Sequence, residues 1–190
     1  MRRAFIIHGW QGHSRQGWYP WLGDLLGKRG FSVTIPDMPD TGDPQPSEWA
    51  DTLSRLVGKP DSDTYLVGHS AGANTVLRYL AMGKGKVGGA VLVAPWPCLK
   101  AVDRRYGKEM GARWLSDGYE WKKVRENADS ITALFSTNDP YVDYRDSDTF
   151  EKELHCKVLI MQGWAHFNES RGVKELPASY DAVLEQAGLK

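Results

Sequence analysis

Cysteine is scarce in this chain, with only Cys98 and Cys156 among 190 residues. The two lie far apart and form no C-x-x-C pair, a pattern that argues against a disulfide framework and against a thiolate metal site. We expect both cysteines to be free thiols with a packing role, and we expect the function to use neither a metal nor another cofactor.

Long apolar runs and excess charge are also missing. The first residues, MRRAFIIHGW, hold too few apolar side chains for the core of a signal peptide, and no later run approaches the length of a membrane span. The 24 basic and 24 acidic side chains cancel, which implies no polyanionic partner. These absences predict a cytoplasmic protein that binds neither nucleic acid nor membrane.

Glycine-rich nucleotide motifs are absent as well. No candidate strand is followed by G-x-G-x-x-G or by G-x-x-x-x-G-K-[ST], and GKGKVGG at 83–89 precedes a strand instead of opening a helix. The sequence therefore argues against a nucleotide-binding protein. Its composition, 41% hydrophobic and 25% charged, is typical of a globular chain, and its length fits one domain over residues 1–190.

Short apolar runs alternate with longer amphipathic stretches along the chain. The runs that predict strands are 4–7, 32–36, 65–68, 87–94, 131–136 and 157–163. Their hydrophobicity is nearly continuous, as in strands covered on both faces, so we expect a mostly parallel sheet. The stretches that predict helices are 19–28, 46–57, 73–82, 120–127, 146–154 and 177–186. This alternation indicates βαβ units and a doubly wound α/β three-layer sandwich.

One stretch, residues 95–119, has no clean assignment. It mixes aromatic with charged residues and is long for a connection between elements. We expect a lid or an extra helix there.

A serine between glycines follows the third predicted strand. Gly68-His69-Ser70-Ala71-Gly72 fits G-x-S-x-G, the nucleophile elbow, with an apolar run directly before it and a helical pattern directly after. An ordinary tight turn is the alternative reading. The strand-turn-helix setting favours Ser70 as a nucleophile.

A nucleophilic serine needs a base, and the chain has five histidines. His166 follows the last predicted strand, at the carboxyl edge where α/β sheets place their sites, so we expect it to be the base. Adjacent residues point apart in an elbow, so His69 should face the core or an adjoining loop. His155 is expected at the surface, while His8 and His13 are expected to scaffold the first loop.

The acid that orients the base should leave another strand end on the same edge. Asp139 follows the predicted strand 131–136, and Pro140 helps to fix the turn. Asp143 is the competing candidate, and Asp37 is expected to be a turn residue. The chain order Ser, Asp, His is that of α/β hydrolases and not of chymotrypsin or subtilisin.

A tetrahedral intermediate also needs two hydrogen-bond donors for its oxyanion. The first expected donor is the backbone N–H of Ala71, the residue after the nucleophile. The second should come from HGWQG at 8–12, where the N–H of Trp10 is the first candidate and Gln11 the alternative. A flexible glycine turn is the other interpretation of this segment.

Together, HGW in the first loop, GHSAGA at the elbow, EWKKVRENA, STNDPYV and GWAHFNESRG resemble the small serine hydrolases typified by retinoblastoma-binding protein 9. The resemblance implies a minimal α/β-hydrolase fold without a large cap domain, with six parallel strands in the order 2-1-3-4-5-6. It also implies a triad of Ser70, Asp139 and His166 that hydrolyses ester-like or amide-like acyl substrates. The retinoblastoma-binding pattern L-x-C-x-E is not matched, because 154–158 reads LHCKV, so no such partner is expected.

Three of the eight tryptophans, Trp10, Trp96 and Trp164, fall in loops after strands. With Gln11 they are candidates to line an acyl pocket, whereas the other five tryptophans are expected to pack in the core or between helices. Without a cap the pocket should be shallow, which predicts a small-molecule substrate with a small to medium acyl group. The competing function is a non-catalytic or regulatory binding protein on the same scaffold.

Overall fold

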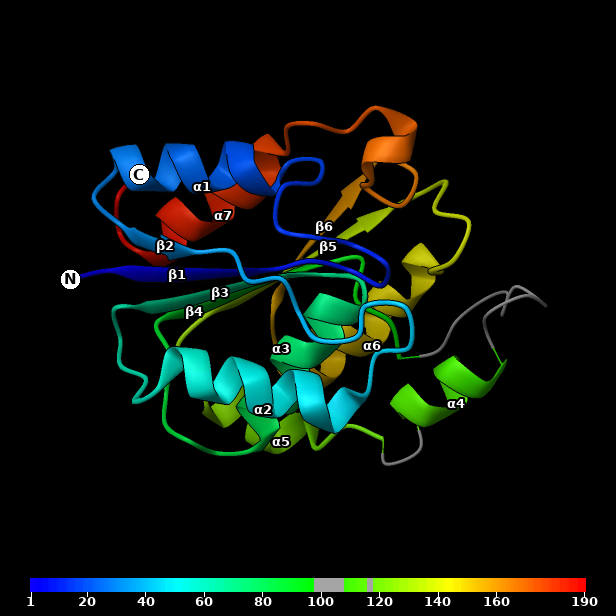
Figure 1. The fold of residues 1–190 in the computed structure, drawn as a ribbon, viewed down its shortest axis with the longest axis horizontal. Helices are drawn as coiled ribbons and strands as arrows, with labels where there is room; N and C mark the ends of the chain where they lie inside the picture. The colour runs from blue at the N-terminus through cyan, green and yellow to red at the C-terminus, as the bar shows by residue number, and fades with distance from the viewer. Residues whose placement is uncertain (98–107, 116–117) are drawn as a thin grey trace.

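The computed structural model describes residues 1–97, 108–115 and 118–190, and the side chains of 108–111 are outside that description. Its centre is a six-stranded sheet with the order β2-β1-β3-β4-β5-β6, in which every neighbouring pair is parallel (Figure 1). The strands are β1 (Arg3–Ile7), β2 (Ser32–Thr34), β3 (Thr64–His69), β4 (Gly89–Val93), β5 (Ile131–Ser136) and β6 (Lys157–Met161). The predicted fold class and strand order are confirmed.

Helices cover both faces of this sheet, as the predicted three-layer sandwich requires (Figure 1). One face carries α1 (Tyr19–Lys28) and α7 (Pro177–Gln186), which contact each other. The other face carries α2 (Pro46–Val57), α3 (Ala71–Ala81), α5 (Trp121–Glu126) and α6 (Ser147–Leu154). Two short 3-10 turns, η1 (Tyr144–Asp146) and η2 (Glu169–Arg171), lie in the loops after β5 and β6.

The predicted element bounds agree closely with the observed ones, with differences that have local causes. The strand expected over 32–36 ends at Thr34, because it lies at the sheet edge and Pro36 has no N–H to donate. Helix α3 begins at Ala71, two residues earlier than expected, directly behind the elbow serine. Within the unassigned stretch 95–119, the extra helix is α4 (Lys108–Leu115), and residues 98–107 and 116–117 lie outside the described residues.

The core lies between the sheet and its helices. Strands β3, β4 and β5 are buried along their whole length, which explains their continuous apolar sequences. Aromatic rings pack between helices and between sheet and helix: Trp49 of α2 packs edge-on against Trp114 of α4, and Phe135 of β5 packs against Phe150 of α6. Each such ring contributes several kcal/mol of apolar burial, about 3–5 kcal/mol if truncated to alanine.

The parallel register brings four strand ends to one edge of the sheet. Ile7 of β1 pairs with Gly68 of β3, and Ser136 of β5 pairs with Met161 of β6. The strand order reverses between β1 and β3, and such a switch point at the carboxyl edge is where α/β sheets bind ligands. None of the helices in the described ranges is both long and apolar enough to cross a bilayer.

Candidate active site

Ser70 occupies a strained turn between β3 and α3. Its φ of 54° and ψ of −119° lie outside the regions that a serine prefers, and its N–H donates to the Val93 carbonyl at 2.8 Å. Non-glycine residues held in such conformations cost about 1–3 kcal/mol and persist where the surroundings fix them. The turn raises Ser70 above the end of β3 while the following residues enter the helix.

The two glycines of the motif are required by close backbone contacts. A Cβ atom at Gly68 would lie 2.6 Å from Cα of Ala73, inside the distance that real Cβ atoms keep. A Cβ atom at Gly72 would overlap the carbonyl oxygens of Ile7 and His8 in the neighbouring strand and loop. The helix therefore packs directly against the ends of β3 and β1, which is possible only without side chains at these two positions.

Three side chains from separate loops meet at this turn in one hydrogen-bonded chain. The Ser70 hydroxyl lies 3.0 Å from Nε2 of His166, and Nδ1 of the same ring lies 2.8 Å from Oδ2 of Asp139. The histidine and the aspartate are buried, with 10% of the His166 side chain and 1% of the Asp139 side chain exposed. The structure thus brings together the three residues that the sequence predicts as nucleophile, base and acid.

The Asp139 carboxylate is held by donors on both oxygens. Oδ1 accepts the backbone N–H groups of Tyr141 at 2.8 Å and Val142 at 3.1 Å, while Oδ2 faces His166. These bonds compensate the desolvation of a buried carboxylate and fix its orientation. A carboxylate held in this way can stabilise positive charge on the adjoining imidazole.

Asp143, the competing candidate, and Asp37 have other partners. Asp143 caps η1, accepting the backbone N–H of Arg145 at 3.1 Å and pairing with the guanidinium of the same residue at 2.7 Å. Asp37 accepts the backbone N–H of Ser14 at 2.6 Å, and the hydrogen bonds from Ser14 lower its pKa. Asp37 therefore joins two loops, close to its expected role in a turn.

The two segments that are predicted to supply backbone donors lie next to Ser70. Ala71 is the first residue of α3, and the first amides of a helix have no acceptor within it. In the loop after β1, a Cβ atom at Gly9 would lie 3.3 Å from Cβ of Ser70, so this loop sits directly on the elbow. The N–H of Gln11 donates to the Thr41 carbonyl at 2.9 Å, and the choice between Trp10 and Gln11 as the second donor stays a prediction.

His8 scaffolds that loop, as its position in the sequence suggests. Its ring is buried, with Nε2 accepting the Met38 N–H at 2.9 Å and Nδ1 2.8 Å from the Gly9 carbonyl, to which it donates. Burial lowers the pKa of His8, which keeps the ring neutral as these bonds require. His13 is exposed and accepts the Arg15 N–H at 3.3 Å.

His69 and His155 also lie away from the Ser70 hydroxyl. Nδ1 of His69 lies 2.7 Å from the Tyr19 hydroxyl and Nε2 lies 2.8 Å from the backbone carbonyl of His166. Burial is the main cause, and repulsion from His166 the second, that lowers the pKa of His69 to about 3. His155 is exposed and accepts from Arg125 at 3.2 Å.

The candidate pocket residues occupy different environments. Trp10 is partly exposed and donates its ring N–H to the Gly42 carbonyl at 3.0 Å, and Gln11 beside it is exposed. Trp164 is partly buried and stacks on Phe167 with centroids 6.2 Å apart. Trp96 is only 1% exposed, so it belongs to the hydrophobic core. A pocket role for these residues stays a prediction.

The other five tryptophans pack as the sequence predicts. Trp18, Trp49 and Trp114 are buried, whereas Trp21 and Trp121 are partly buried against the core. Of the two cysteines, Cys156 is a buried free thiol. Cys98 lies outside the described residues.

Several residues near the triad carry no signal that sequence reasoning could use. Tyr141 is 43% exposed and its ring lies edge-on to His166, with centroids 4.9 Å apart. Asn74, fully buried in the first turn of α3, bonds both backbone groups of Trp96: its Nδ2 donates to the carbonyl at 3.1 Å, and its Oδ1 accepts the N–H at 3.3 Å. These contacts join segments far apart in the chain, so no local motif marks them.

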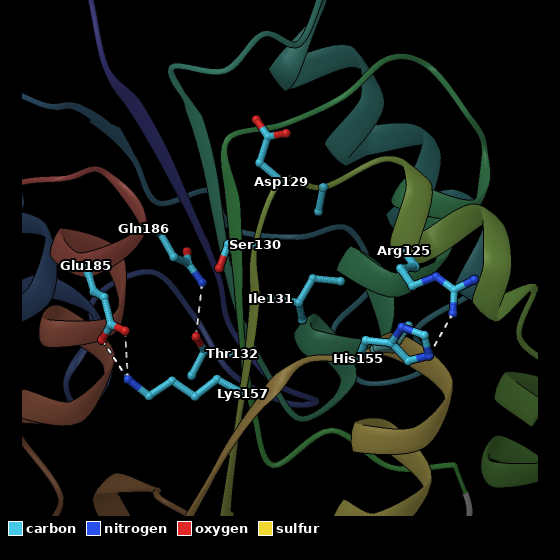
Figure 2. Close-up of a pocket in the computed structure, with 11 residues that line it drawn as sticks. Arg125, Asp129, Ser130, Ile131, Thr132, His155, Lys157, Glu185 and Gln186 are labelled. Atoms are coloured by element: carbon cyan, nitrogen blue, oxygen red, sulfur yellow. Dashed lines mark hydrogen bonds and ion pairs between the residues drawn. The ribbon is translucent and has the colours of Figure 1, made fainter.

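A separate polar hollow lies at the other end of the sheet, where β5 and β6 begin (Figure 2). Its volume is about 510 Å³, and its wall carries an ion pair of 2.7 Å between Lys157 and Glu185. Its lining includes none of Ser70, His166 and Asp139.

Within the part of the chain that the structure describes, no cluster of three or more histidine, cysteine, aspartate or glutamate side chains could ligate a metal ion.

Comparison with known proteins adds to this geometry. The chain is 28% identical over 188 residues to the putative hydrolase YdeN of Bacillus subtilis, covering 96% of this chain and 94% of that protein. It is 25% identical over 171 residues to the rat (Rattus norvegicus) serine hydrolase RBBP9, covering 88% of each. The crystal structure of the B. subtilis ydeN product superposes with a TM-score of 0.90 at 27% identity, over 99% of this chain and all (100%) of that one.

A family model agrees with these pairwise similarities. It describes serine hydrolases and matches residues 4–185, from β1 to the end of α7. The match includes all the loops that meet at Ser70. The chain is therefore a hydrolase and belongs to the serine hydrolase family.

Proposed function

We propose that this protein hydrolyses ester-like or amide-like acyl compounds through a covalent acyl-enzyme, with a carboxylic ester as the preferred substrate. Ser70 is the nucleophile, His166 the general base and Asp139 the acid that orients it. The observation that supports this is the chain of hydrogen bonds from Ser70 through His166 to Asp139, at 3.0 and 2.8 Å. The order of roles is that of a serine hydrolase triad.

Acylation follows from this arrangement. The Ser70 oxygen attacks the carbonyl carbon of the substrate while Nε2 of His166 takes the hydroxyl proton, and Asp139 stabilises the imidazolium. The carbonyl oxygen becomes an oxyanion, which the N–H groups of Ala71 and Trp10 bind. The intermediate then breaks its bond to the leaving group, which departs with the proton from His166.

Deacylation repeats these steps with water. His166 takes a proton from a water molecule, whose oxygen attacks the acyl carbon on Ser70. The second tetrahedral intermediate releases the carboxylic acid, and the proton returns from His166 to the Ser70 oxygen. Each cycle consumes one water and restores the enzyme, so no cofactor enters the balance.

We expect small or medium acyl groups to be turned over fastest. Tyr141, whose ring lies edge-on to His166, offers exposed apolar surface beside the triad, and Trp10 lies one residue after Gly9 in the loop that contacts the elbow. A panel of nitrophenyl esters of increasing chain length tests this expectation. Fastest turnover on acyl chains longer than about ten carbons would contradict it, because such chains need a long apolar channel.

A fluorophosphonate probe tests the nucleophile directly, because it reacts with activated serines. The expected result is labelling of the wild type that disappears in Ser70→Ala. Absence of labelling in folded wild-type protein would overturn the proposal and favour a non-catalytic binding protein on this scaffold.

Paired substitutions test the acid. Asp139→Asn should lower kcat by about 10⁴-fold, as loss of the orienting carboxylate does in such triads. Asp143→Asn is the matched control, because Asp143 lies four residues along and pairs with Arg145, and it should keep activity close to wild type. The opposite result, in which Asp143→Asn is inactive and Asp139→Asn is active, would reassign the acid.

A further inference from the structure

The loop that carries His166 is strained. Ala165 and Phe167, on either side of the base, both have left-handed backbone conformations, with φ of 47° and 54°. For a residue with a Cβ atom this conformation costs about 1–2 kcal/mol. The loop therefore depends on its surroundings to hold His166 in place.

Two side chains hold the residues on either side of His166. Oδ1 of Asn138, in the loop after β5, accepts the N–H of Ala165 at 2.8 Å. Directly before α1, the buried ring N–H of Trp18 donates to the carbonyl of Phe167 at 2.9 Å. Both bonds join the strained loop to segments that are distant in the chain.

The backbone of His166 itself is held by His69. Nε2 of His69 lies 2.8 Å from the His166 carbonyl, so this nitrogen must carry the proton and donate it. His69 immediately precedes Ser70 in the chain, and its ring centroid lies 5.1 Å from that of His166. One covalent link and one hydrogen bond thus connect the nucleophile to the backbone of its base.

Tyr19 of α1 selects the His69 tautomer that can donate a hydrogen bond to the His166 carbonyl. Its hydroxyl lies 2.7 Å from Nδ1 of His69, and the buried phenol has a raised pKa, so it donates a hydrogen bond there. A neutral imidazole that accepts at Nδ1 carries its proton on Nε2. Both nitrogens of His69 are thereby used, in a ring that is buried.

We propose that His69 is a positioning residue that fixes the base loop against the nucleophile elbow, and that Tyr19 holds it in the donating form. The consequence for catalysis rests on the proposed function of Ser70 and His166. By fixing the His166 carbonyl, the bond from His69 keeps Nε2 of His166 within reach of the Ser70 hydroxyl, 3.0 Å away. An apolar side chain at position 69 would pack there but would leave the His166 carbonyl and the Tyr19 hydroxyl without these bonds.

The neutral state of His69 also suits the reaction. His166 becomes an imidazolium when it takes the Ser70 proton, and a second positive charge on the nearby His69 ring would oppose that step. The other titratable groups close to His69 are Tyr19, a hydrogen-bond donor, and His8, which is itself buried and neutral. His69 thus supports the base without competing for its proton.

The first test does not depend on activity. Nitrogen-15 NMR of the histidine rings should show His69 as the neutral Nε2–H tautomer, still uncharged at pH 5. Tyr19→Phe should shift this tautomer signal. Tyr180→Phe is the matched control, because Tyr180 packs on Trp21 away from His69, and it should leave the signal unchanged. An Nδ1–H tautomer or an imidazolium at pH 5 would overturn the inference.

The second test measures the effect on catalysis. His69→Leu keeps apolar volume without a donor and should lower kcat by about 100-fold, as a misplacement of about 1 Å does, with a much smaller change in KM. His69→Gln restores an N–H donor on a side chain of similar reach and should recover most of this loss. Equal kcat values for the leucine variant and the wild type, or for the two variants, would overturn the inference.

The two proposals can fail separately. Wild-type protein that carries no fluorophosphonate label would end the proposed function, while the NMR tautomer still decides how His69 is bonded. Labelling of His69→Leu at the wild-type rate would end the positioning role and leave Ser70 as the nucleophile. Far-ultraviolet circular dichroism checks that each variant is folded. If His69→Leu does not fold, Tyr19→Phe, which removes only a hydroxyl group, provides the same kinetic test.

Discussion

The burial of His69 predicts a specific loss of stability in acid. Its pKa is about 3 in the folded protein, against an ordinary value of 6.5 that it regains on unfolding. Below pH 6.5 the unfolded chain therefore binds a proton that the folded protein does not. Stability supplied by the neutral ring is complete above pH 6.5 and is lost as the pH falls toward 3.

The size of the effect follows from the two pKa values. Each unit of separation corresponds to about 1.4 kcal/mol, so lowering the pH from 7 to 5 should remove about 2 kcal/mol of stability through His69 alone. His8, whose pKa is also lowered by burial, adds to the loss in the same direction. The contribution of His69 must therefore be isolated by comparison with a variant.

His69→Gln provides that comparison, because glutamine keeps a donor and does not titrate. Urea unfolding of both proteins at pH 7, 6 and 5 gives the free energy of unfolding at each pH. The wild type should lose about 2 kcal/mol more than the variant between pH 7 and pH 5, since all other titrating groups are shared. Parallel pH dependence of the two proteins would refute the reasoning, because it would require an ordinary pKa for His69 in the folded state.

Three further predictions concern the fold. Gly72→Ala should destabilise the protein by about 3 kcal/mol or more, seen in urea unfolding, because its Cβ atom would overlap the Ile7 and His8 carbonyls. Tyr79→Phe should increase the free energy of unfolding by about 1 kcal/mol and so raise the thermal midpoint, because the buried Tyr79 hydroxyl has no hydrogen-bond partner among the described residues. Cys156 should react with iodoacetamide only after unfolding, because burial raises its thiol pKa to about 11; rapid alkylation of native Cys156 would contradict this.

Much of the fold is readable from local sequence. The helices Tyr19–Lys28, Pro46–Val57 and Pro177–Gln186 and the strand Ile131–Ser136 have the bounds that their periodicity predicts. A proline near the first residue is a strong local signal for the start of a helix. A continuous apolar run is a strong local signal for a strand that is buried on both faces. The short edge strand β2 carries a weaker pattern, and its predicted end was two residues too long.

The meeting of the three candidate side chains was predictable from chain order. Ser70, Asp139 and His166 each follow a predicted strand, so a parallel sheet brings them to one edge. The bonds that orient them were not predictable, because Asn138 and Tyr19 act through single contacts with residues 27 and 50 positions away. For His69 the motif indicated where the side chain does not point, but only the folded chain shows what it binds.

Asn74 has a consequence for how this enzyme can change over evolution. Its amide bonds both backbone groups of Trp96, so the chain leaves β4 from a point fixed to the helix that follows Ser70. Substitutions or insertions directly after residue 97 therefore begin beyond an anchored position, and we expect them to leave the conformation of Ser70 intact. In such an arrangement the sequence of one segment can vary while the hydrogen bonds around Ser70 are inherited unchanged.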